Sequence, residues 1–183
     1  MLLSFALWVQ SLGFFTYLRE GSWTYPVVMS LHMVGIALFG GMILMTDMRL
    51  LGWAMTSHSV SDVIDQFRWT KRIGFLLTAT CGFLLFCCKA EEYYYNIFFR
   101  TKLTVFALIF VHAMIFRGSV YNNAAAIDRA PQVPGRAKLA ASLSLLLWVS
   151  VAIAGRGIGY IETPFGLHAQ RIDPVSMSVL QRP

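Results

Sequence analysis

One apolar stretch, YPVVMSLHMVGIALFGGMILMTDMR, runs from Tyr25 to Arg49 and constrains the fold more than any other part of the chain. The hydrocarbon core of a bilayer is about 30 Å thick, and a helix needs about 20 apolar residues to cross it. The stretch therefore predicts a membrane-spanning helix over residues 25–46. A single ionisable side chain, His32, lies inside it. An imidazole at that depth is costly unless it is paired, ligated or hydrated, so His32 is a candidate functional residue.

The composition supports an integral membrane protein. Of the 183 residues, 57% are hydrophobic and 13% are charged, whereas soluble domains carry about 25% charged residues. The net charge of +6 is spread over the connections and forms no single basic run, which argues against nucleic acid as a partner. It favours anionic lipid head groups instead. We expect a multi-pass protein of a bacterial inner (cytoplasmic) membrane, with the lipid bilayer as its first partner.

Further apolar stretches predict three more spans, over residues 72–89, 101–117 and 138–161. Residues 2–19 predict a helix in the membrane interface, with a short fifth span as the alternative. The segment 162–183 contains three prolines and no long apolar run, and predicts an extended surface tail. The expected fold class is therefore all-α, an integral membrane four-helix bundle with an N-terminal interfacial helix, in a single transmembrane domain over residues 1–183.

Residues 47–71 predict a polar connection with a short amphipathic helix on the membrane surface, capped by Ser59 or Ser61. Four spans place both termini on one side of the membrane. The side with the two long connections carries eight Lys or Arg and the other side seven. These numbers are too similar for the positive-inside rule to decide the orientation. Periplasmic termini are our expectation.

Two histidines suggest a cofactor. His32 lies about 10 Å inside the first span and His112 about 16 Å inside the third, at 1.5 Å per helical residue. Two imidazoles from parallel helices can ligate one b-type haem iron inside a bundle. Arg156, near the end of the fourth span, would meet the haem propionates, and Gly35, one turn after His32, would leave room for the ring.

A structural interpretation of the same residues stays open. Each histidine can instead hydrogen-bond to a neighbouring helix and hold the bundle together, and Arg156 can extend to the interface. Cys81, Cys87 and Cys88 are best explained as small buried side chains. No Asp or Glu lies inside a predicted span, which argues against a carboxylate-driven transporter. Asp47, at the far end of the first span, is expected to form a structural ion pair with Arg117.

Three segments of the chain form a recognisable pattern: WTYPVVMSLHMVGIALFGGMILMTDMRLLG, FRTKLTVFALIFVHAMIF and AGRGIGY. In these segments, and over most of residues 20–161, the chain resembles a family of small bacterial four-helix membrane proteins of unknown function. It implies the four-helix membrane fold and no particular activity, and in that family the position of His112 often holds another polar residue. A looser similarity, in helix count and histidine placement only, is to four-helix b-type cytochromes and copper-resistance membrane proteins.

Together these features predict a membrane subunit of a respiratory or photosynthetic electron-transfer complex, without catalytic activity of its own. It would hold one haem b between His32 and His112, with Gly35 and Arg156 beside the ring. The alternative is an accessory subunit that holds no cofactor and packs against cofactor-bearing membrane partners. A small transporter or channel is the third interpretation.

Overall fold

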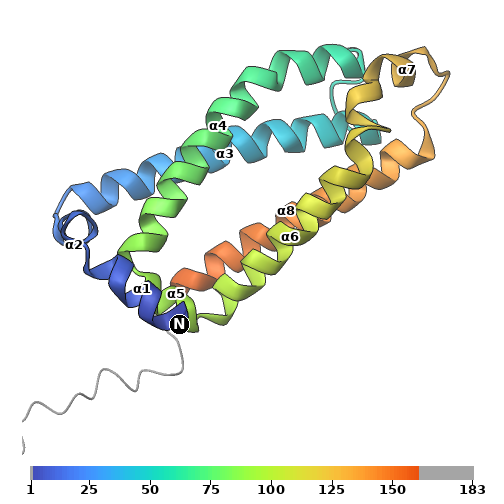
Figure 1. The fold of residues 1–183 in the computed structure, drawn as a ribbon. Helices are drawn as coiled ribbons and strands as arrows, with labels where there is room; N and C mark the ends of the chain where they lie inside the picture. The colour runs from blue at the N-terminus through green and yellow to red at the C-terminus, as the bar shows by residue number, and fades with distance from the viewer. Residues whose placement is uncertain (1, 161–183) are drawn as a thin grey trace, which may run out of the picture.

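Four long helices make up the bundle in the computed structural model, which describes residues 2–160 (Figure 1). Each is long and apolar enough to cross a membrane. Regular structure in this part of the chain is entirely helical, which confirms the all-α fold class. The long helices are α3 (Thr24–Leu51), α4 (Val60–Cys88), α6 (Ile97–Arg117) and α8 (Gly135–Tyr160).

The bundle is built from two helix pairs. Helix α3 packs along α4, α6 packs along α8, and the pairs meet through α3 and α8. The 3-10 turn η1 (Tyr121–Asn123) and helix α7 (Ala124–Arg129) lie at one end, called the α7 end here. Helices α1 (Leu2–Ser11), α2 (Gly13–Glu20) and α5 (Ala90–Tyr95) lie at the other, called the terminal end (Figure 1).

Large apolar side chains are exposed along all four long helices, for example Val34, Leu76, Phe110 and Leu146. Such a surface is stable in hydrocarbon and unstable in water. The chain is therefore a multi-pass membrane protein whose outer faces meet lipid. Its main cluster of buried apolar residues lies at the α7 end, where Leu50, Phe116 and Ala140 come together.

Helix α3 continues about one turn beyond the predicted end at residue 46. It ends at Gly52, whose φ of 78° places it in the left-handed region that glycine tolerates best. The amide of Trp53 donates to the carbonyl of Met48 over 2.9 Å, as in a Schellman termination. The extra turn brings Asp47 inside the helix.

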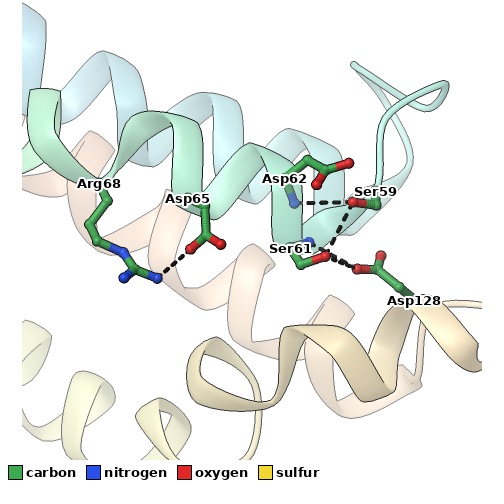
Figure 2. Close-up of polar contacts among 6 residues, drawn as sticks. All are labelled: Ser59, Ser61, Asp62, Asp65, Arg68 and Asp128. Carbon is green, nitrogen blue, oxygen red and sulfur yellow. Dashed lines mark hydrogen bonds and ion pairs between the residues drawn. The ribbon is translucent and has the colours of Figure 1, made fainter.

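The expectation of a separate surface helix before a span at residue 72 is wrong. Residues 60–88 form one continuous helix, α4, in which Val60 and Val63 are buried. Ser59 caps it by accepting from the amide of Asp62 at 3.0 Å, as the sequence predicts. Asp128 of α7 also accepts from the amide and the hydroxyl of Ser61 at 2.9 and 2.6 Å (Figure 2). These contacts start the helix early and tie it to α7.

The N-terminal segment forms two helices where one was expected over residues 2–19. The break lies at Leu12, which has extended backbone angles. Gln10 accepts a hydrogen bond from the amide of Glu91 at 3.0 Å, and the guanidinium of Arg19 donates to the carbonyl of Cys88 at 3.3 Å. These bonds hold α1 and α2 against the terminal end. The predicted tail, 162–183, lies outside the described residues.

Helices α3 and α4 approach closely at two glycines. A Cβ at Gly35 would lie 2.6 Å from the hydroxyl oxygen of Thr78, and a Cβ at Gly74 would lie 2.6 Å from the amide nitrogen of Phe39. Small residues at such positions let membrane helices pack backbone to backbone.

We expect Gly74→Val to lower the free energy of unfolding by about 1–3 kcal/mol, because the added methyl groups must push α3 away from α4. Reversible unfolding in mixed micelles measures the change. Gly41→Val is the matched control, since a Cβ at Gly41 meets nothing within 4 Å. Equal stability of the two variants would contradict the close packing described here.

Candidate functional site

His32 is a buried side chain that joins α3 to α4. Its Nδ1 donates a hydrogen bond to the carbonyl of Thr78 over 3.0 Å. The ring lies against Gly82, where a Cβ would come within 2.8 Å of its Cε1 atom. With Nδ1 donating, the neutral ring has an unprotonated Nε2. Lys102 of α6 is close enough to act on His32 electrostatically.

His112 has the same role in the other helix pair. Its Nε2 donates to the carbonyl of Ala140 on α8 over 3.0 Å. The ring packs on Phe116, with 4.9 Å between the ring centroids. Each histidine therefore bridges one helix pair, which is the structural interpretation that the sequence left open.

In this arrangement His32 and His112 do not fit a shared haem. His112 lines a cavity that extends along α3 from Phe39 to Asp47. At 1.5 Å per residue, Phe39 and Asp47 lie about 10 and 22 Å further along the helix than His32. The Nε2 of His112 also holds a hydrogen bond to Ala140, so it is not free to ligate iron.

The other predicted haem contacts are also occupied by protein atoms. The space beside Gly35 is filled by the backbone and hydroxyl of Thr78. The guanidinium of Arg156 donates to the hydroxyl of Tyr160 and stacks 4.6 Å from that ring's centroid on the surface of α8. Next to Arg156, the ring of Phe98 packs against Gly157 and fills the space beside it. The four predicted residues thus do not converge on one site.

The polar residues that do converge lie around Asp47. This carboxyl group is fully buried, at 0% exposure. Its Oδ1 accepts a long hydrogen bond of 3.4 Å from the hydroxyl of Tyr121, and its buried Oδ2 has no hydrogen-bond partner in the described part of the chain. Lys71 of α4 lines the same cavity as Asp47. An acid in this position carries a buried acceptor oxygen that can take a further hydrogen bond.

Asp47 opens onto a cavity of about 210 Å³ between the two helix pairs. Its polar end is formed by the side chains of Thr46, Asp47, Lys71, His112, Tyr121 and Ser144. The rest of the wall is apolar. It includes Phe39 and Trp148, whose rings pack edge to face with 5.3 Å between centroids.

This site was not predicted because the predicted first span ends at residue 46, just before Asp47. The expected ion pair between Asp47 and Arg117 is wrong: Oδ1 of Asp47 is hydrogen-bonded to Tyr121, and Arg117 is exposed. One signal was present. Ile43, Asp47 and Leu50 share one helical face at spacings of four and three residues, which places the acid on the inward face if the helix continues to Gly52.

The bridging role of the histidines predicts a loss of stability when either ring is removed. His32→Leu and His112→Leu should each lower the free energy of unfolding by about 0.6–2 kcal/mol, the value of a hydrogen bond between membrane helices. Reversible unfolding in mixed micelles gives the values, and His58→Leu in the exposed α3–α4 connection is the control. Wild-type stability in both buried variants would rule out the bridging role.

Comparison with known proteins gives one match. No curated protein and no solved structure matches the chain. A family model matches residues 7–161, which include all four long helices and every residue that lines the cavity at Asp47. The model describes a family of unknown function, DUF6644. The chain belongs to this family, as its four-helix membrane fold and the resemblance seen in its sequence led us to expect.

Proposed function

We propose that this membrane protein is a binding subunit, which takes a small amphipathic molecule from the bilayer into the cavity at Asp47. The observation that carries the proposal is the fully buried Asp47, which lines this cavity and whose Oδ2 has no hydrogen-bond partner among residues 2–160. Burying a carboxyl group in an apolar region is costly unless its oxygens are paired. Ionisable groups inside a membrane protein therefore mark functional sites by default.

The shape and chemistry of the cavity indicate the class of ligand. A volume of about 210 Å³ admits a single ring or a group of similar size. The apolar wall around Phe39 and Trp148 suits a flat hydrophobic body. At the polar end, Asp47 accepts a hydrogen bond while Lys71 and Tyr121 donate. A head group with a hydroxyl group could donate to Asp47 and accept from Lys71 or Tyr121.

A membrane-soluble quinol has this combination of features. One hydroxyl of its ring would donate to Asp47 Oδ2, and the oxygen would accept from Lys71 or Tyr121. A quinol site would give the chain the place in an electron-transfer assembly that its sequence suggested, beside membrane subunits that carry the redox cofactors. In this proposal the protein binds the quinol and its partners perform the electron transfer.

A thermal-shift titration tests the proposal. The full chain in lipid nanodiscs is titrated with a short-chain ubiquinol analogue, and the unfolding midpoint is followed. A ligand that binds only the folded state, at 100 times its Kd, stabilises the protein by about 2.7 kcal/mol. We expect a rise in the midpoint for the wild type and little or none for Asp47→Asn.

Two controls make the result specific. Asp62→Asn removes an exposed acid of α4 outside the cavity and should keep the full shift. The dimethyl ether of the same quinol has no hydroxyl donor for Asp47 and should produce a smaller shift. A wild-type midpoint that does not respond to the quinol, or an equal shift in Asp47→Asn, would overturn the proposed function.

A further inference from the structure

Two hollows meet at one side chain in this protein. The first is the cavity at Asp47, between the two helix pairs. The second is a hollow of about 310 Å³ on the surface of the α7 end, between α4 and the η1–α7 segment. Tyr121 lines both. Its phenol therefore stands between the surface of the protein and the buried carboxyl group.

The surface hollow is polar and faces water. Ser61, Asp65, Arg68 and Asn122 contribute to its wall, and the carboxylate of Asp65 pairs with the guanidinium of Arg68 along the exposed face of α4 (Figure 2). Asp128 ties α7 to the start of α4 through Ser61. This clamp holds the two walls of the hollow in place.

The inner side of the same phenol is held weakly. The hydroxyl of Tyr121 lies 3.4 Å from Oδ1 of Asp47, which is long for a hydrogen bond between oxygens. The residue sits in η1, a single 3-10 turn. The floor of the hollow beside it is formed by the small side chains of Ala124 and Ala125. Tyr121 is the residue that the walls of the two hollows share.

We propose that the surface hollow is the aqueous entrance to Asp47 and that Tyr121 is its gate. Water and protons would reach the buried carboxyl group from the α7 end of the bundle, while an amphipathic ligand enters from the bilayer. The inference rests on the proposed function, because it assigns the second access route of the same site. Tyr121 thereby becomes a positioning residue for Asp47 and a barrier to water.

Cysteine modification tests this route. Ser144 lines the inner cavity beside Asp47 and is buried, and Ser144→Cys changes a single atom of its side chain. The full chain, with Cys81, Cys87 and Cys88 replaced by Ala, is reconstituted in vesicles. A small cationic methanethiosulfonate reagent that does not cross the membrane is then added to each side in turn. The rate of modification reports water access to the cavity.

We expect Ser144→Cys to react from the side of the α7 end alone. Adding Tyr121→Ala should raise the rate about tenfold, which corresponds to a barrier about 1.4 kcal/mol lower. Adding Ala125→Phe, which fills the surface hollow, should lower the rate. Leu146→Cys, on an exposed face of α8 that meets lipid, is the control and should not react in any background.

The outcomes separate the two proposals. The gate proposal would be overturned if Ser144→Cys reacted from the side of the terminal end. It would also be overturned if neither Tyr121→Ala nor Ala125→Phe changed the modification rate. Neither result would contradict quinol binding. Loss of the quinol shift would overturn the proposed function, yet the modification rates would still report the aqueous route. A retained quinol shift, together with a modification rate that rises in Tyr121→Ala, would support both the quinol site and the gate.

Discussion

The arrangement of the α7 end depends on the burial of one carboxyl group. Asp47 reaches the interior because α3 runs one turn past the apolar stretch and ends at Gly52. Its surroundings must then offset the cost of desolvation. Helix α4 supplies the ammonium of Lys71 and η1 supplies the hydroxyl of Tyr121, yet no side chain or backbone group of residues 2–160 donates to Oδ2. A site of this kind is ready for a ligand that donates a hydrogen bond.

The rest of the bundle holds this site between two separately fastened helix pairs. His32 bridges α3 and α4 through the carbonyl of Thr78, and His112 bridges α6 and α8 through that of Ala140. The close contacts at Gly35 and Gly74 add backbone packing within the first pair. The cavity lies between the pairs, where α3 meets α8 through Phe39 and Trp148. Polar bonds thus join the helices within each pair, and the cavity lies between the pairs.

Much of the fold could be predicted from the sequence, because hydrophobic length alone determines which segments cross a bilayer. All four long apolar helices were predicted, and Ser59 was one of the two predicted candidates for the cap of α4. The continuous α4 was missed because the polar residues between 61 and 72 obscure an apolar face that includes Val60 and Val63.

The site was harder to predict than the fold. Depth along single helices could not show that His32 and His112 turn towards different neighbours, because helix rotation and tilt are set by packing. Asp47 was excluded by a span boundary one turn too early. Tyr121 could not be placed at all from the sequence, since it lies in a short turn whose position depends on the clamp between Asp128 and Ser61.

The measurement that tests the central claim most directly is a double-mutant cycle on Asp47 and Lys71. Stability is measured by reversible unfolding for Asp47→Asn, Lys71→Met and the double variant. Lys71→Met alone leaves a buried acid without its counter-charge and should cost about 1–3 kcal/mol or more, whereas the double variant should recover most of that loss. Effects that simply add would mean that the two side chains do not interact, and would contradict a charged site at Asp47.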